Sequence, residues 1–299
     1  MSSAFLFAIC VLIWGTTWYA IKFQLAGSAP DIGVAIRFSL AAVLLLAWCA
    51  TRNIRLAFAW QTQAWLAALG VLGFSASYLL VYYAEVHIVS GLVAVGYSAL
   101  PLVNMVLARA FLSTPMSRRV ALGGACGLLG IALIFWPEFE RLSTGAPLLA
   151  GAMLTAGAVI ASGLANMVVA RNQAKGIDGW GPLAIAMGWG ALASWGFVAL
   201  VGGPVRIEWT TAYALSLLYL AVFGSVLAFG AYFVLIARIG AARSAYVGVM
   251  ATVLALLVSA VFEGYDWRWA TVIGIALAVT GNVLALHPAS RSTPVKSPA

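Results

Sequence analysis

Long apolar runs, separated by short polar connections, dominate the hydrophobic pattern of the chain. A helix of about 20 residues, rising about 1.5 Å per residue, crosses the hydrocarbon core of a bilayer, which is about 30 Å thick. The runs lack the period-two alternation of strands in a membrane barrel. We therefore predict an all-α integral membrane protein with ten transmembrane helices, over residues 4–23, 31–51, 63–84, 88–112, 118–136, 146–170, 180–201, 210–237, 242–262 and 268–286.

The composition excludes a water-soluble domain. Of the 299 residues, 64% are hydrophobic and 8% are charged, and the mean hydropathy is +1.04. Soluble domains have about 45–50% apolar and about 25% charged residues, and a soluble fold of this length does not enclose enough interior for so many apolar side chains. The three cysteines, Cys10, Cys49 and Cys126, lie in apolar runs, so we expect packed side chains and no disulfide framework.

The net charge of +8 is explained by orientation in the membrane. With the N-terminus inside, eleven Lys and Arg residues fall on the cytoplasmic side and four on the outer side, as the positive-inside rule requires. Both termini are therefore predicted to be cytoplasmic. The longest basic cluster is the pair Arg118 and Arg119, so we expect the lipid bilayer, and no nucleic acid, as a partner.

The two halves of the chain resemble each other. Gly123 and Gly130 in the fifth run have counterparts in Gly274 and Gly281 of the tenth, with the same spacing. Residues 73–84 similarly parallel 224–235. Each half has five predicted spans, and an odd number makes the two copies insert in opposite senses. Gly-rich apolar helices also resemble one another by chance, but spacing and span count agree independently. We predict two inverted five-helix repeats, 1–142 and 143–288, followed by a cytoplasmic tail, 289–299.

Several motifs resemble those of one known family. They are W-G-T-T-W-Y-A-I-K at 14–22, R-F-S-L-A at 37–41, Pro101, R-I-G-A-A-R at 238–243 and the paired glycines of the fifth and tenth runs. Over nearly its whole length the chain resembles the drug/metabolite transporter superfamily in its ten-helix, EamA-type form. Within it, the chain looks like the YddG type. The resemblance implies an exporter of aromatic and other amino acids in the bacterial inner membrane, with helices one to four and six to nine around a central cavity.

Polar and aromatic side chains recur at steps of three and four residues in three predicted spans, so each set shares one helix face. They are Ser75, Tyr78, Tyr82 and Glu85 in the third run, Ser90, Tyr97, Pro101 and Asn104 in the fourth, and Thr155, Ser162 and Asn166 in the sixth. Hydrogen bonding between helices, worth about 0.6 kcal/mol on average, explains any one of them. For the whole set we predict a cavity lining that binds substrate through Trp14, Trp18, Tyr78, Tyr82, Tyr97, Asn104, Asn166, Tyr232 and Tyr246.

Four further residues are predicted to have gating or structural roles. Arg37 lies inside the second span, where it either pairs with carbonyls or an acid such as Asp31 or Glu85, or attracts a substrate carboxylate. Lys22 is near the outer end of the first span, where it can snorkel to the interface. Pro101 removes a backbone N–H bond and produces either a hinge or a static kink. Glu85 is predicted to lie on the outer side.

Residues and motifs that the sequence lacks disfavour several classes of function. No acid is expected deep in a span, which disfavours a small-multidrug-resistance type of proton antiport, and the few cations disfavour a sugar-phosphate carrier. The chain has no H-E-x-x-H, phosphate-loop or Cys/His motif, so we expect no enzyme, metal or cofactor. No channel filter is visible. We predict a monomer-capable exporter of small neutral or zwitterionic solutes, most simply aromatic and other amino acids, by alternating access. The alternative is an exporter of hydrophobic drugs or organic cations.

Overall fold

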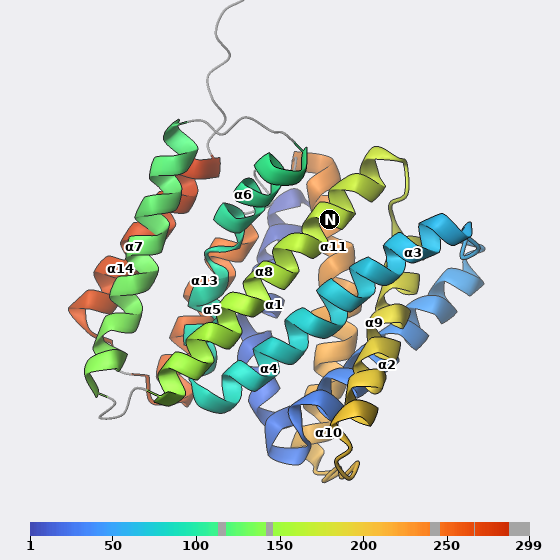
Figure 1. Cartoon of the computed structure of the whole chain (residues 1–299), viewed down its shortest axis with the longest axis horizontal. Coiled ribbons are helices and arrows are strands. Elements are labelled where there is room, and N and C mark those ends of the chain that lie inside the picture. The colour runs from blue at the N-terminus through green and yellow to red at the C-terminus, as the bar shows by residue number, and fades with distance from the viewer. Residues whose placement is uncertain (113–117, 142–145, 240–245, 266, 287–299) are drawn as a thin grey trace, which may run out of the picture.

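A computed structural model of the chain (Figure 1) describes residues 1–112, 118–141, 146–239, 246–265 and 267–286. The predicted repeat boundary near 142–145 and the predicted tail 289–299 lie outside these residues. The elements, with η marking π-helix, are α1 (Ser3–Gly27), α2 (Pro30–Thr51), α3 (Trp60–Leu69), η1 (Gly70–Ala76), α4 (Ser77–His87), α5 (Ser90–Tyr97), α6 (Leu100–Leu112), α7 (Arg118–Arg141), α8 (Ala146–Ala174), α9 (Trp180–Val201), α10 (Thr211–Leu218), η2 (Tyr219–Leu227), α11 (Ala228–Ile239), α13 (Tyr246–Phe262) and α14 (Trp269–Leu286).

These elements form ten helical rods, which agree with the ten predicted spans. The elements α3, η1 and α4 continue one another, as do α10, η2 and α11, and α5 and α6 are separated by two residues. Among the described residues, seven rods are long and apolar enough to cross a membrane. Three shorter apolar helices, Leu122–Trp136, Val247–Phe262 and Trp269–Gly281, lie at the fifth, ninth and tenth predicted spans. The prediction of an all-α membrane protein is confirmed at this level.

Local sequence sets where several helices begin. Pro30 occupies the first turn of α2, where its fixed φ suits a helix and its missing N–H has no intrahelical partner to lose. Ser2 Oγ accepts a hydrogen bond from the backbone N–H of Phe5 at 3.2 Å. Thr210 Oγ1 accepts one from Tyr213 N at 3.1 Å. These side chains cap α1 and α10 by satisfying N–H groups that a helix start leaves unbonded.

The two π-helices occupy matching places in the two halves. Helices α3 and α10 begin at Trp60 and Thr211, and α7 and α14 begin at Arg118 and Trp269, so each pair starts 151 residues apart. The same shift places η1 inside η2. A π-helix bonds residue i to i+5, is rare, and occurs frequently at functional sites. Its recurrence at one position is a structural counterpart of the sequence similarity between the halves.

Helix packing is also reciprocal between the halves. Helix α4 packs on α8, and its counterpart α11 packs on α1. In the same way η1 packs on α9, and η2 packs on α2. The pair α7 and α14 lies to one side of the other helices (Figure 1) and forms the most extensive helix contact of all.

Glycines let α7 and α14 approach backbone to backbone. Gly130 lies against Gly274, and Gly281 lies against Gly123 and Gly127. A methyl group at Gly130, Gly274 or Gly281 would overlap the backbone of the facing helix. Such small-residue contacts are the usual basis of close helix packing in membranes. The glycines of the two runs are therefore packing surfaces.

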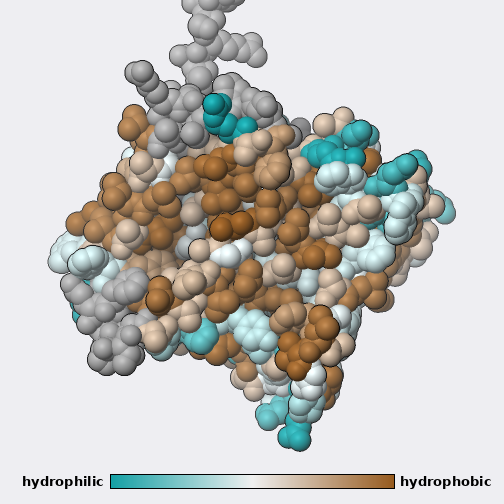
Figure 2. Space-filling view, viewed as in Figure 1, coloured by the Kyte–Doolittle hydropathy of each residue, from teal (hydrophilic) through white to brown (hydrophobic). Residues whose placement is uncertain are grey.

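The surface is suited to lipid. Figure 2 shows hydrophobic residues over most of one broad face, with hydrophilic residues gathered mainly near the ends of the helices. Large apolar side chains such as Leu122, Leu192 and Leu200 are 69%, 63% and 86% exposed. Exposure on this scale is normal against hydrocarbon and unusual in a soluble protein.

We predict that Gly130→Ala lowers thermal stability in detergent micelles, because the added methyl group would lie 2.6 Å from the backbone nitrogen of Ala278. Overpacking of this kind typically costs about 1–3 kcal/mol. Gly127→Ala is the matched control, since its methyl group meets no atom within 4 Å. Equal melting temperatures for the two variants would contradict the close contact of α7 and α14.

Candidate functional site

A continuous series of aromatic rings crosses the interior of the bundle. Both halves contribute to it, through α1, α2, η1 and α4 on one side and α11 on the other. We call this series the aromatic track. In order, its rings are Tyr232, Trp14, Phe229, Phe74, Phe38 and Tyr78, with successive centroid separations of 5.1, 5.4, 5.8, 5.5 and 4.7 Å.

Three rings of the aromatic track are predicted binding residues, namely Trp14, Tyr78 and Tyr232. All three are half-buried, and Trp14 Nε1 donates a hydrogen bond to the carbonyl of Gly224 at 3.3 Å. The other three rings were missed, because a phenylalanine in an apolar run is indistinguishable from one that packs or faces lipid. Only the tertiary arrangement shows that they join the predicted residues.

A second group of predicted residues lies where α1, α5, α6 and α8 meet. Trp18 and Tyr97 contact each other with ring centroids 5.1 Å apart. The hydroxyl of Tyr97 lies within hydrogen-bond distance of Ser162 Oγ, at 3.1 Å. Asn166 Nδ2 donates to Asn104 Oδ1 at 3.1 Å. These polar groups bond between helices, and the aromatic faces beside them stay half-buried.

The fourth span is interrupted between α5 and α6. Residues Ser98 and Ala99 form a turn there. Pro101 explains the break, because it has no N–H for the carbonyl of Tyr97 and its ring crowds that carbonyl. Burial changes at the same place: residues 90–95 are all buried, and residues 96–105 are all half-buried.

Arg37 is one of the most deeply buried side chains, with 2% of its surface exposed. Its guanidinium lies over the rings of Tyr78 and Phe38, 4.7 and 5.3 Å from their centroids. Arg37 Nε donates to Ser225 Oγ at 3.4 Å. The hydroxyl of Ser225 donates its single proton to Leu220 O at 3.0 Å, so it can only accept from Arg37. Arg37 therefore lies at the end of the aromatic track, between α2, α4 and η2.

Two predicted binding residues lie apart from the half-buried rings. Tyr82 is fully buried, its ring packs beside Gly33, and its hydroxyl has no hydrogen-bond partner among the described residues. Tyr246 is the first residue of α13, and its side chain is outside the described part of the chain. Two small apolar cavities, one between α5, α7, α13 and α14 and one between α6, α7 and α14, are lined by none of the predicted binding residues.

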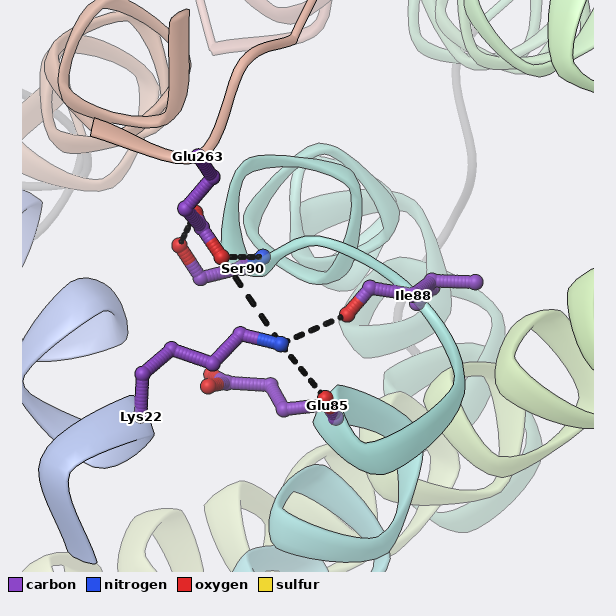
Figure 3. A network of polar contacts seen from close by, with 5 residues as sticks. All are labelled: Lys22, Glu85, Ile88, Ser90 and Glu263. Carbon is purple, nitrogen blue, oxygen red and sulfur yellow. Dashed lines mark hydrogen bonds and ion pairs between the residues drawn. The ribbon is translucent and has the colours of Figure 1, made fainter. Parts of the chain in front are cut away.

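A polar network closes the end of the bundle where α1, α4 and α13 finish and α2 and α5 begin (Figure 3). We call this the Lys22 end. Lys22 Nζ lies 3.7 Å from Glu263 Oε1 and donates to the carbonyls of Glu85 and Ile88 at 2.5 and 3.1 Å. The Glu263 carboxylate accepts from the backbone N–H of Ser90 at 3.2 Å and from its hydroxyl. Lys22 thus caps the C-terminal end of α4, and Glu263 caps the N-terminal end of α5.

The network corrects two expectations. Lys22 is held inside protein contacts rather than snorkelling to the interface. Glu85 was predicted to lie after the third span, on the outer side; it instead lies within α4, is 2% exposed and has both carboxylate oxygens without a hydrogen-bond partner among the described residues. The expectation failed because Glu85 is near a helix end in sequence, whereas α1 and the α4–α5 turn cover it. Glu263 was not predicted, although it is an acid directly following the ninth apolar run.

A second set of hydrogen bonds joins α1 to α10 at the Lys22 end. Gln24 Nε2 donates to Tyr213 O at 3.0 Å and to Ser216 Oγ at 2.8 Å. Beyond it, the backbone N–H of Glu208 donates to Gly27 O at 2.8 Å. The Lys22 end is therefore closed on both flanks of α1. No group of His, Cys, Asp and Glu that could hold a metal occurs among the described residues.

The sequence pattern of the EamA-like transporter family matches residues 1–136 and 149–286. The chain belongs to the EamA-like transporter family. Its helical membrane fold, with an interior built from both halves, is therefore that of a transporter, and such transporters are not enzymes.

Individual relatives are distant. The chain is 26% identical over 251 residues to the "Uncharacterized transporter YoaV" of Bacillus subtilis, covering 82% of this chain and 83% of that one. An "Uncharacterized transporter" of Archaeoglobus fulgidus is 26% identical over 139 residues, and the chain matches 48% of its length. A solved chain titled "Crystal structure of protein" has a TM-score of 0.67 at 16% identity, with 95% and 96% of the two chains covered, which shows the fold alone.

The Lys22–Glu263 contact predicts energetic coupling. In a double-mutant cycle of Lys22→Met and Glu263→Gln, we expect each single variant to lower the melting temperature and the double variant to lose less than the sum. Groups in one ion-pair network commonly couple by about 0.5–3 kcal/mol. Lys175→Met, an exposed cation at the end of α8, is the control and should not couple to Glu263→Gln. Strict additivity of Lys22→Met and Glu263→Gln would exclude the contact.

Proposed function

We propose that this protein exports small zwitterionic or neutral organic solutes, most simply aromatic and other amino acids, by alternating access. One observation supports this most: in a member of a transporter family, both halves contribute rings to one interior aromatic track. Rings stack on planar or apolar groups, and the Tyr and Trp polar ends add hydrogen bonds. Trp14, Trp18, Tyr78, Tyr97 and Tyr232 then contact substrate directly. Asn104 and Asn166 hold α6 against α8 beside it, and Tyr82 and Tyr246 complete the proposed set.

The proposed architecture is two inverted five-helix repeats, 1–142 and 143–288. The helix starts 151 residues apart, the paired π-helices and the reciprocal contacts of the helices support it. Transporters built in this way place the substrate site between the two repeats, near the middle of the bilayer. The position of the aromatic track between halves fits that arrangement.

We orient the Lys22 end to the outside of a bacterial inner membrane, with both termini in the cytoplasm. The distribution of Lys and Arg supports this orientation. The structure then corresponds to a state closed to the outside by Lys22, Glu263 and Gln24. Opening requires these contacts to break while the opposite end closes, as a two-state transporter must do.

The hairpins 73–104 and 224–256 are the proposed moving parts. At the Lys22 end α5 packs on α13, and Thr252 Oγ1 donates to Ala94 O at 3.2 Å. Helix α5 also packs on α8, and beyond the break before Pro101 α6 packs on α8 as well. A break at that point lets the two parts of the fourth span move separately, so we propose that Pro101 marks a hinge.

Export of hydrophobic drugs or organic cations is the second candidate, because aromatic rings also bind cations. Cell protection separates the two. We expect expression of the protein to rescue cells from toxic amino-acid analogues and not from lipophilic cations. Rescue from the cations alone would favour the second candidate.

Counterflow in proteoliposomes tests the proposed site. We predict exchange of labelled phenylalanine, tryptophan or threonine by the wild-type protein, and at least a tenfold loss of phenylalanine exchange in Trp14→Ala, because the ring that joins Tyr232 to Phe229 in the aromatic track is removed. Trp60→Ala is the matched control, since Trp60 is 77% exposed. Equal exchange rates in wild-type protein and Trp14→Ala would show that the aromatic track does not bind substrate.

Accessibility of a buried reporter tests the closure at the Lys22 end. In a background without the three native cysteines, Val93→Cys should react slowly with a membrane-impermeant maleimide added outside cells, because Val93 is fully buried in α5. Adding Glu263→Gln should accelerate labelling several-fold. Trp209→Cys, at a position 66% exposed, should label rapidly in both backgrounds. An unchanged rate at Val93→Cys would mean that Glu263 does not hold this end closed.

A further inference from the structure

Three neighbouring side chains contain half of the buried polar atoms that lack a hydrogen-bond partner. Eight such atoms occur in the described part of the chain, and four of them are Arg37 Nη1, the Tyr82 hydroxyl and the two carboxylate oxygens of Glu85. These three side chains are 2%, 0% and 2% exposed. Buried polar groups are normally bonded, so an accumulation of unbonded ones at one place needs an explanation.

The three side chains form one cluster. Tyr82 and Glu85 follow Tyr78 at steps of four and three residues along α4, and Arg37 lies over the ring of Tyr78 from α2. Tyr82 interacts with Arg37 through charge and through the side-chain hydrogen-bonding groups, and with Glu85 through charge. Glu85 interacts in turn with the charge of Arg37. Lys22 and Glu263 are the other charged groups that act on Glu85. The cluster therefore joins the end of the aromatic track to the Lys22 end.

The protein does not neutralise these two charges by direct pairing. Among the described residues the ion pair found is that of Lys22 with Glu263, and neither Arg37 nor Glu85 belongs to one. Burying an unpaired ion costs several kcal/mol. Stacking of the guanidinium on two rings offsets only about 1–2 kcal/mol of this. A buried carboxyl group can be neutralised by taking up a proton. A ligand that brings an ammonium group to Glu85 and a carboxylate to Arg37 also gives both side chains a bonded partner.

We infer that Arg37 and Glu85 bind the carboxylate and the ammonium group of an amino-acid zwitterion, with its side chain along the aromatic track. This inference rests on the proposed function and assigns its substrate class. Arg37 suits the role because a guanidinium donates two parallel hydrogen bonds to a carboxylate. Ser225 accepts from Nε and so leaves the Nη groups directed elsewhere.

The cluster also explains how binding can be linked to the closed Lys22 end. The backbone carbonyl of Glu85 accepts a hydrogen bond from Lys22 (Figure 3). The carboxylate of Glu85 belongs to the cluster. Glu85 is therefore part of both the Lys22 end and the cluster. Along α4, Tyr82 lies between Tyr78, which the Arg37 guanidinium covers, and Glu85. Its hydroxyl can therefore bond either the carboxylate or the ammonium group of the ligand. A substrate bridging Arg37 and Glu85 therefore joins α2 and α4 beside the closure.

Competition in counterflow tests the inference on wild-type protein. Labelled phenylalanine is exchanged against unlabelled phenylalanine, phenylalaninamide, which lacks the carboxylate, or 3-phenylpropionate, which lacks the ammonium group. We expect each analogue to compete at least tenfold more weakly than phenylalanine. Equal competition by all three, with phenylalanine exchanged, leaves the proposed function in place and overturns the zwitterion site. Absence of exchange with any amino acid contradicts the proposed function itself.

Two variants assign the groups separately. Arg37→Met should remove the preference for phenylalanine over phenylalaninamide and keep the preference over 3-phenylpropionate. Glu85→Gln should do the reverse. Arg52→Met, an exposed cation at the end of α2, should keep both ratios.

If both variants change thermal stability but phenylalaninamide and 3-phenylpropionate compete in them as in the wild-type protein, Arg37 and Glu85 only stabilise each other's charge. The inference is then wrong. If a variant does not fold, the wild-type competition still decides.

Discussion

The cost of placing polar groups in hydrocarbon determines how this protein is organised. A charged side chain at the centre of a bilayer costs about 2.5–3.5 kcal/mol by insertion measurements, so charges inside a membrane protein face other protein groups or a ligand. Lys22, Arg37 and Glu85, three of the charged residues within the spans, follow this rule, because they lie between helices rather than on the lipid surface. In the proposed function, these residues mark the end where the bundle is closed and the place where a polar solute binds.

The fold was predictable because lipid imposes a simple requirement on the backbone. Every N–H and C=O must bond within the segment, so long apolar runs become helices and their number can be counted. The ten predicted runs correspond to ten rods for this reason. Local details were less accessible: the π-helices η1 and η2 follow no composition signal, and the break before Pro101 was predicted as a bend without its position at Ser98 and Ala99.

The candidate site was predictable only in part, because helical periodicity shows which residues share a face and not what that face meets. Trp14, Tyr78 and Tyr232 lie in the aromatic track as a lining requires, whereas Tyr82, on the same face as Tyr78, is wholly enclosed. The phenylalanines of the track and the partner of Lys22 come from distant segments. Residue spacing contains no information on such pairs, and sequence alone left two partners open for Arg37.

A structure of the protein with bound phenylalanine tests the central claim most directly. The account predicts the phenyl ring against Trp14 or Tyr78, with the carboxylate at Arg37 and the ammonium group at Glu85, and Lys22 still in contact with Glu263. Phenylalanine bound elsewhere, for example between α7 and α14 or on the lipid-facing surface, with Arg37 and Glu85 unchanged, would contradict it.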